Sequence, residues 1–272
     1  MSGAPGRGPL LAGAEAKACC ATAYESDAAR WLLGDVLHPG GRDLTLRAAS
    51  VAGLAAGERA LDIASGAGVT ACLLAAEAGV DAVGVDYGRE AVARARRRAD
   101  AAGLAARVSF VQGDAEALPL ADAGFDFAIC ECSMCTFPDK EAAASEMARV
   151  LRPGGRLAIT DMTARFEDLP EALRNAASQV ACVADALPLD GYVALLEQAG
   201  LRVTATEDHS DALRSMIDRA EARLRAARII GGALALGEYA DKIELGIELS
   251  RSALAEVAAG RLGYSLLVAE RA

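Results

Sequence analysis

Residues 59–86 read RALDIASGAGVTACLLAAEAGVDAVGVD, and this stretch decides the fold. The apolar run at 60–63 predicts a short buried strand. A turn of small residues follows, and 69–78 then reads as a helix. A second apolar run at 82–85 predicts another strand, which ends at the acid Asp86. This order of strand, turn, helix and strand predicts a βαβ unit that binds its ligand at the carboxyl ends of the strands.

The small-residue turn at 64–68 is the predicted ligand site of this unit. Gly66 and Gly68 allow positive φ angles and let backbone N–H groups approach a ligand closely. Asp86, at the tip of the next strand, is placed to accept hydrogen bonds from a ribose diol. The third glycine of a Gly-x-Gly-x-x-Gly fingerprint is missing, which favours a single adenosine over a dinucleotide. The alternative is that these glycines serve helix packing alone.

Composition limits the class of protein. The chain has 272 residues, of which 53% are hydrophobic and 4% aromatic, and this suits one large α/β domain with tightly packed helices. No apolar run approaches the roughly 20 residues of a membrane span, and the N-terminus lacks a signal peptide, so we expect a cytoplasmic protein. The net charge of −10 disfavours nucleic acid as a partner. The basic run at 94–98 reads as a solvated helix face.

The rest of the chain alternates strands and helices before it becomes mostly helical. We expect residues 1–16 to be flexible. Predicted strands lie at 108–112, 125–130, 156–161, 201–207 and 263–269. Predicted helices lie at 17–33, 43–51, 87–102, 140–151, 168–184, 189–200, 210–228 and 241–259, with a loose glycine-containing region at 231–237.

Three features occur in a characteristic order: the glycine turn, the strand-end acids Asp86 and Asp114, and the LRPGGRL turn at 151–157. Together they resemble class I S-adenosylmethionine (SAM)-dependent methyltransferases. The resemblance implies an α/β fold with a Rossmann-like, seven-stranded sheet, whose closing antiparallel strand at 263–269 is expected at the sheet edge, and SAM as the cofactor. It also implies that Asp114 accepts a hydrogen bond from the exocyclic amine of adenine, while Ala115 supplies a backbone N–H.

The resemblance also suggests how the chain is divided and which residues hold the cofactor. We expect a helical cap at 17–56, a SAM-binding core at 57–209, a helical insertion at 210–260 and a closing strand at 261–272. The cap of this class commonly closes over the cofactor, which makes Tyr24, Asp35 and His38 lid candidates, although His38 reads equally well as an ordinary loop histidine. The predicted cofactor-binding residues are Ala64, Ser65, Gly66, Gly68, Asp86, Tyr87, Gly113, Asp114, Ala115, Glu131 and Tyr24.

The seven cysteines carry the prediction about the acceptor. Three of them fall in the segment 130–135 (CECSMC), directly after the predicted fourth strand, where this fold places the acceptor. Thiolates are soft ligands that suit trivalent arsenic, antimony or mercury. The alternative is that these cysteines are small buried hydrophobes, which is our preferred reading for Cys72 and an equal one for Cys130. The roles of Cys130 and Cys135 stay open.

The segment from Cys130 to Leu187 resembles arsenite methyltransferases more closely, through Pro138-Asp139-Lys140 and the Arg-Val-Leu turn at 149–151. The resemblance implies that Cys132 and Cys182 bind the arsenic. The family's further redox cysteine before the glycine turn is absent, and Cys19 or Cys20 is a candidate for its part, with a thiol reductant as a possible co-substrate.

The chemistry implied is attack by the lone pair of thiolate-bound trivalent arsenic on the sulfonium methyl group, which needs no general base. Proximity and orientation would supply roughly 7–11 kcal/mol of rate acceleration. Two alternatives stay open: a methyltransferase acting on a small organic O, N, C or S nucleophile, and a soft-metal-binding protein with a vestigial fold. The oligomeric state is not predicted.

Overall fold

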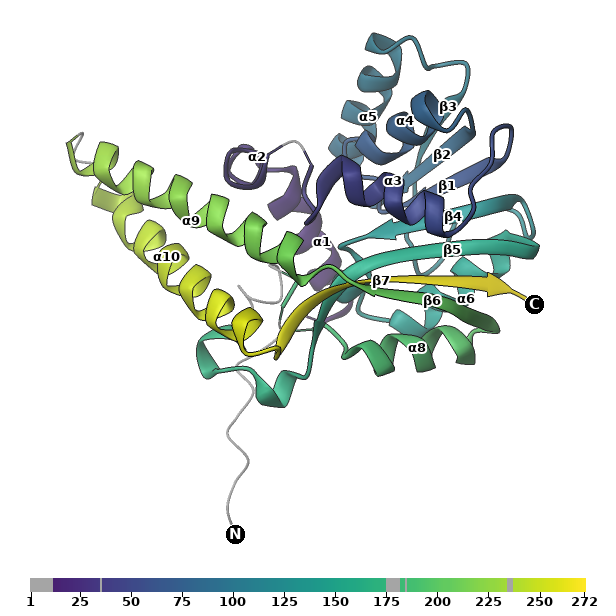
Figure 1. Cartoon of the computed structure of the whole chain (residues 1–272). Helices are drawn as coiled ribbons and strands as arrows, with labels where there is room; N and C mark the ends of the chain where they lie inside the picture. The colour runs from purple at the N-terminus through teal and green to yellow at the C-terminus, as the bar shows by residue number, and fades with distance from the viewer. Residues whose placement is uncertain (1–11, 35, 175–181, 184, 234–236) are drawn as a thin grey trace.

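The computed structural model describes residues 12–34, 36–174, 182–183, 185–233 and 237–272. It contains one seven-stranded mixed sheet in the order β3-β2-β1-β4-β5-β7-β6, in which β7 is antiparallel to both of its neighbours (Figure 1). The strands are β1 Arg59–Ile63, β2 Asp81–Asp86, β3 Val108–Gln112, β4 Phe125–Glu131, β5 Leu151–Ala164, β6 Leu201–Asp208 and β7 Leu262–Arg271. The prediction of a Rossmann-like, seven-stranded sheet is confirmed, but the closing strand β7 lies between β5 and β6 and not at the sheet edge where it was expected.

Helices cover both faces of the sheet (Figure 1). One face carries α3 (Gly41–Val51), α4 (Val69–Glu77) and α5 (Arg89–Ala101), and the other carries α6 (Lys140–Val150) and α8 (Leu189–Gln198). The start of α6 follows from its sequence, because the Asp139 carboxylate accepts a hydrogen bond from Ala142 N and caps the helix. These five helices therefore fall where they were predicted, within a few residues at each end.

The core is divided by the sheet into two apolar layers. Successive strand residues point to opposite faces, so Phe127 and Ile129 of β4 pack under α3, α4 and α5, while Ala128 and Cys130 pack under α6 and α8. Each of these four residues is fully buried. Cys130 thus lies in the core, as the packing alternative for this residue anticipated.

The N-terminal cap differs from the single helix predicted at 17–33. It forms α1 (Gly13–Glu25) and α2 (Asp27–Leu33), which are separated at Ser26. Ser26 has extended backbone angles, and its Oγ accepts a hydrogen bond from Ala29 N, so it ends one helix and caps the next. The helix also begins at Gly13, inside the segment 1–16 that was expected to be flexible. Residues 1–11 and the lid candidate at position 35 lie outside the described residues.

A helical hairpin stands between β6 and β7, where the insertion was predicted. It consists of α9 (Ser210–Ala233) and α10 (Gly237–Ala258), which pack along one another and project from the sheet (Figure 1). The loose region expected at 231–237 is wrong in part, because α9 continues to Ala233 and α10 begins at Gly237. Arg223 of α9 donates to the carbonyl oxygens of Trp31 and Leu32, which ties the hairpin to the cap.

The segment between β5 and α8 was predicted to be helical at 168–184. Its described part contains two short 3-10 turns, Phe166–Asp168 and Glu171–Leu173, and most of the remainder lies outside the described residues. Leu169, Leu173 and Cys182 join Cys135 and residues of α9, α10 and β7 in a third apolar cluster. This cluster anchors the base of the hairpin beside the end of β4.

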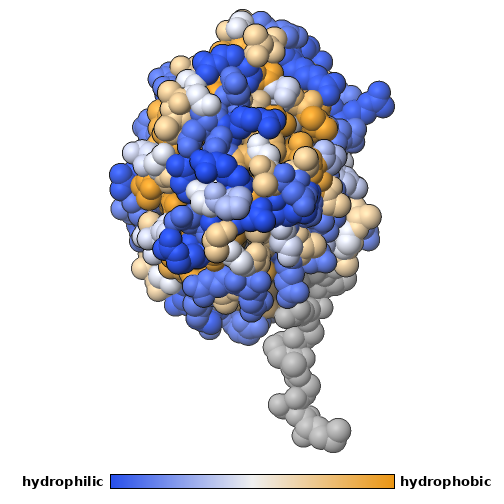
Figure 2. Space-filling model, turned by 90° about the vertical axis from the view of Figure 1, so that its right-hand side faces the viewer, coloured by the Kyte–Doolittle hydropathy of each residue, from blue (hydrophilic) through white to orange (hydrophobic). Residues whose placement is uncertain are grey.

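One face of the molecule shows how polar and apolar residues are distributed over the surface. Figure 2 shows the side of the molecule that carries the C-terminus, where hydrophilic residues cover much of the surface and hydrophobic residues occur in small groups. In the part of the chain that the structure describes, no helix combines the length and apolar character needed to cross a bilayer.

Candidate functional site

A cavity of about 210 Å³ opens at the carboxyl ends of β1, β2 and β4 and is covered by α1. Of the residues predicted for the site, twelve line this cavity: Cys20, Tyr24, Ala64, Ser65, Gly66, Asp86, Tyr87, Gly113, Asp114, Ala115, Glu131 and Cys132. Gly68, Cys19 and Cys182 are not among its lining residues, whereas the lid candidate His38 is.

The turn after β1 uses left-handed backbone angles at alternate positions. Ala64, Gly66 and Gly68 have φ angles of 59°, 51° and 75°. At Gly66 an added Cβ would meet no atom within 4 Å, so the backbone at the cavity edge stays open to a ligand. At Gly68 the Cβ would lie 2.5 Å from Phe110 Cζ. The two glycines therefore differ: Gly66 borders the cavity, and Gly68 permits close packing at the start of α4.

Asp86 fixes this turn from the next strand. Its Oδ2 accepts a hydrogen bond from Gly66 N at 2.7 Å, and its Oδ1 accepts one from Gly88 N at 2.7 Å. Burial raises the pKa of Asp86, although both backbone bonds favour the ionised form. From the other side, Arg98 of α5 donates from Nε to the carbonyl oxygen of Ala67 at 2.9 Å. The turn is thus held at both flanks.

The acid beyond β3 has a partner that the sequence reading missed. Lys17 of α1 donates to Asp114 Oδ2 at 2.6 Å and also contacts the Glu116 carboxylate. Asp114 Oδ1 accepts from Glu116 N at 3.0 Å. Lys17 lies 97 residues from Asp114 in the chain, so only the tertiary fold could reveal this pair. It closes α1 over the β3 end of the cavity.

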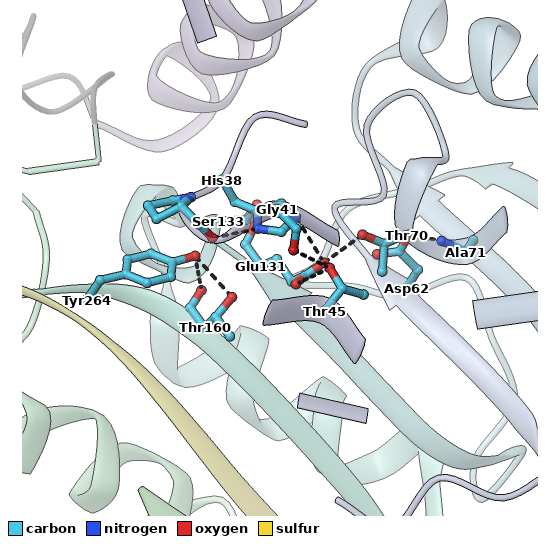
Figure 3. A network of polar contacts seen from close by, with 11 residues as sticks. His38, Gly41, Thr45, Asp62, Thr70, Ala71, Glu131, Ser133, Thr160 and Tyr264 are labelled. Atoms are coloured by element: carbon cyan, nitrogen blue, oxygen red, sulfur yellow. Dashed lines mark hydrogen bonds and ion pairs between the residues drawn. The ribbon is translucent and has the colours of Figure 1, made fainter. Parts of the chain in front are cut away.

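Glu131, at the end of β4, is the centre of a buried polar network (Figure 3). Its carboxylate accepts hydrogen bonds from Thr45 Oγ1 at 2.9 Å and from Thr70 Oγ1 at 2.6 Å. His38 Nε2 lies 3.5 Å from Glu131 Oε2, while His38 Nδ1 faces the carbonyl oxygen of Pro39 at 3.1 Å. Glu131 is therefore held in a fixed position against the cavity by side chains from three separate segments.

A second acid, Asp62 of β1, lines the cavity beside this network. Its Oδ2 accepts from Ala71 N at 3.0 Å, and burial followed by the nearby Glu131 charge raises its pKa well above the usual range. Within the described chain the buried Ser65 Oγ, also on the cavity wall, has no hydrogen-bond partner. Buried acids and an unsatisfied hydroxyl suit a ligand that brings positive charge and polar groups, as an adenosyl sulfonium amino acid does.

The structure brings Cys132 and Cys182 together from positions 50 residues apart. The Cys182 thiol donates to the carbonyl oxygen of Cys132, with Sγ and O 3.4 Å apart. Both residues adopt left-handed φ angles, 50° and 64°, which are uncommon outside glycine. Strained backbone of this kind is concentrated at functional sites. Cys132 lines the cavity, and Cys182, in the third apolar cluster, contacts Cys132 from behind.

The groups around Cys182 favour ionisation of this thiol over that of its neighbours. Hydrogen bonds from Cys132 and Cys135 and from the hydroxyl of Tyr24, whose oxygen is 3.1 Å from Cys182 Sγ, hold the pKa of Cys182 well below its usual range. The bond to Cys182 raises the pKa of Cys132, and burial raises that of Cys135. Burial also raises the pKa of the neighbouring Asp161 to about 7.

The remaining cysteines are less suited to chemistry. Cys19 is exposed away from the cavity, and burial raises the pKa of Cys20 to about 11. Cys72 and Cys130 are buried in the core. Among the residues that the structure describes, no group of three or more His, Cys, Asp or Glu side chains is arranged to hold a metal ion. The soft-ligand chemistry of the site therefore depends on a pair of thiols.

The basic run at 94–98, expected to be solvated, is divided in the structure. Arg96 and Arg97 are exposed, but Arg94 and Arg98 are half-buried and line the cavity. Their spacing of four residues puts them on one helix face, next to the buried Ala91 and Ala95. This spacing was the sequence feature that could have predicted two cavity-facing arginines. It was overlooked because the whole run is rich in arginine and was interpreted as one solvated face.

Comparison with known proteins places the chain among methyltransferases. Residues 54–227 match the family model of a methyltransferase domain. The chain is 37% identical over 190 residues to the 27-O-demethylrifamycin SV methyltransferase of Amycolatopsis mediterranei, covering 68% of this chain and 69% of the relative. It is 38% identical over 165 residues to the arsenite methyltransferase of Halobacterium salinarum, covering 58% of this chain but only 41% of that longer relative.

The fold has close counterparts among solved structures. The Haemonchus contortus phosphoethanolamine N-methyltransferase 2, solved in complex with SAM, superposes with a TM-score of 0.78 at 21% sequence identity. The match covers 95% of this chain and 60% of the nematode protein.

Proposed function

The chain belongs to the family of methyltransferase-domain proteins, and on that premise we propose that it methylates trivalent arsenic held by the thiolates of Cys132 and Cys182. The family and its relatives support SAM-dependent methyl transfer to a small molecule. Our proposal concerns the identity of the methyl acceptor, trivalent arsenic. The observation that carries it is the pairing of Cys132, which lines the cavity, with Cys182, which lies directly behind it.

We assign the cofactor along the carboxyl edge of the sheet. Asp114 and the backbone of Ala115 would hold adenine, and Asp86 would hold the ribose hydroxyls. The backbone around Gly66, with Asp62 and Glu131, would hold the charged methionyl end, since two buried carboxylates favour a cation. When bound, SAM supplies an electrophilic methyl group on its sulfonium. The chain's own residues orient that end and exclude water.

The thiols would supply the acceptor's geometry. Cys182, whose pKa its neighbours lower, would bind the arsenic as a thiolate, and Cys132, which lines the cavity, would place the arsenic on the side of the cofactor. Trivalent arsenic bound to two sulfurs keeps its lone pair, so an As–C bond forms as the S–CH₃ bond of the sulfonium breaks, with no proton to remove. This agrees with the soft character of thiolate ligands. The 38% identity to an arsenite methyltransferase supports the same assignment.

A second candidate is methyl transfer to a hydroxyl group of a small organic molecule. His38 lines the cavity, and a histidine within reach of a bound hydroxyl group is the side chain that most often acts as a general base. The relative named for rifamycin O-methylation supports this reading. A soft-metal-binding protein with a vestigial cofactor fold, the third reading, predicts cofactor binding without turnover on any acceptor.

One assay separates these functions. The protein is incubated with SAM, arsenite and a thiol reductant, and S-adenosylhomocysteine and methylarsenicals are quantified. We expect Cys132→Ser and Cys182→Ser each to lower the rate at least 100-fold, while Cys72→Ala, a buried cysteine outside the cavity, keeps it within about twofold. Arsenic methylation that survives in the double serine variant would exclude the thiol site. His38→Ala should abolish any O-methyl transfer but retain measurable arsenic methylation, because a lone-pair nucleophile needs no general base, while the lost contact to Glu131 should raise the KM for SAM.

A further inference from the structure

Helix α1 touches both ends of the cavity. At the β3 end Lys17 is bound to Asp114, and at the start of α5 Glu25 Oε1 accepts from Ala91 N at 2.7 Å. At the acceptor end the Tyr24 hydroxyl is 3.1 Å from Cys182 Sγ. One helix of 13 residues therefore contacts the predicted adenine position, the predicted ribose position and the acceptor thiol.

Polar contacts contribute much of what holds this helix in place. Only Ala16 and Cys20 of α1 are buried, and Tyr24 is partly buried against the third apolar cluster, so the helix removes little apolar surface from water. An element with so few buried contacts opens more easily than the core. The loss of one of its hydrogen bonds therefore changes its closed population measurably.

We propose that Tyr24 is a positioning residue that makes cofactor binding and acceptor binding depend on one another through α1. Lys17, Tyr24 and Glu25 all line the cavity, so the closed helix is the state that retains the cofactor. A group bound to Cys182 takes up the sulfur electrons that accept the Tyr24 hydrogen bond, and it releases one attachment of α1. The apparent cofactor affinity then falls with the closed fraction, and by linkage the cofactor weakens acceptor binding by the same factor. The acceptor part of this inference rests on the proposed arsenic function.

A double-mutant cycle tests the coupling without any acceptor. S-adenosylhomocysteine affinity is measured by calorimetry for the wild type, Tyr24→Phe, Cys182→Ala and the double variant. Each single variant removes the same hydrogen bond, so each should weaken binding about threefold to tenfold. The double variant should bind no more weakly than the single variant with the lower affinity, because no further contact is lost. Cys182→Ser keeps an acceptor oxygen and should restore most of the affinity. Additive effects, or an unchanged affinity in Tyr24→Phe, would overturn the proposal.

A matched control uses a second buried tyrosine near the same thiols. Tyr264 of β7 donates to Thr160 Oγ1 at 3.0 Å and lies beside Cys132, but it has no link to α1. Tyr264→Phe should therefore combine additively with Cys182→Ala. If the Cys182→Ala protein does not fold, a second measurement replaces the mutant cycle. The rate at which methyl methanethiosulfonate modifies Cys182 in the wild type is compared with and without S-adenosylhomocysteine, which should protect the thiol. This protection should be lost in Tyr24→Phe, and its persistence there would contradict the proposal.

An arsenite arm separates this inference from the proposed function. Saturating arsenite should weaken S-adenosylhomocysteine binding to the wild type about threefold to tenfold and leave Tyr24→Phe unchanged. If the mutant cycle is non-additive but arsenite does not bind, the role of Tyr24 stands and the arsenic acceptor is wrong. If arsenite binds while the cycle is additive, the acceptor stands and the coupling through Tyr24 is wrong.

Discussion

Substitution of the two turn glycines should separate cofactor binding from stability. An alanine at Gly68 must adopt a φ of 75° and place its methyl group 2.5 Å from Phe110 Cζ and 2.8 Å from Ala95 Cβ. The left-handed backbone costs about 1–2 kcal/mol, offset by about 0.4–1 kcal/mol from the less flexible unfolded chain. Overpacking against Phe110 adds about 1–3 kcal/mol. We expect Gly68→Ala to lose about 2–4 kcal/mol of unfolding free energy.

Gly66→Ala should behave in the opposite way. Its methyl group meets no protein atom within 4 Å, so only the left-handed backbone cost of about 1 kcal/mol remains. The same methyl group stands at the cavity edge that Gly66 lines, so it should weaken S-adenosylhomocysteine binding at least tenfold. Gly103→Ala, with a φ of 69° and open space around it, supplies the reference for the backbone cost alone.

Urea unfolding and calorimetric titration of the three variants would check this difference. Gly68→Ala should show the lowest unfolding midpoint and, while folded, a cofactor affinity nearer to the wild type than that of Gly66→Ala. Equal stability of Gly68→Ala and Gly103→Ala would refute the packing role of Gly68. Normal cofactor affinity in Gly66→Ala would refute the placement of the ligand beside the turn.

Three further outcomes follow from single contacts. The pKa of the Asp161 carboxyl is about 7 in the folded protein and about 4 in the unfolded chain. Its protonated form therefore stabilises the fold fully below pH 4, and this contribution is lost as the pH rises to 7. Relative to Asp161→Asn, the wild type should lose on the order of 2–4 kcal/mol over that window in urea titrations, and parallel pH profiles would contradict this. Arg98→Met removes the bond to Ala67 and should weaken S-adenosylhomocysteine binding about fivefold with little change in melting temperature. Lys17→Met should weaken S-adenosylhomocysteine binding about threefold and abolish the dependence of this affinity on salt concentration, because dissolved ions screen the ion pair between Lys17 and Asp114. A salt dependence equal to that of the wild type would show that this ion pair is not involved.

The sequence predicted the sheet well because its signals are local. The apolar run, glycine turn and strand-end acid between 59 and 86 lie within one βαβ unit, and the structure places β1, α4 and β2 within a residue or two of the prediction. The insertion before the last strand was also visible, since two amphipathic helices separate two apolar runs. Local periodicity does not report a break such as Ser26, where a single side chain ends one helix and begins another.

The site was harder to predict because its contacts join distant segments. Lys17 meets Asp114 across 97 residues, and Thr45 meets Glu131 across 86. Neither partner has a sequence pattern that points to the other. The pairing of Cys132 with Cys182 was expected only through the resemblance to a family, since nothing in their spacing implied it.

The position of β7 bears on how the chain is made. This strand follows the other six in the chain, yet it lies between β5 and β6 rather than at the sheet edge. During translation, β5 and β6 leave the ribosome before the strand that joins them, and the 53 residues at 209–261, which include the hairpin, must follow first. Until then both strands present unpaired edges, which are templates for aggregation. Nascent chains stalled before residue 262 should accordingly be strong chaperone clients, whereas released chains should not.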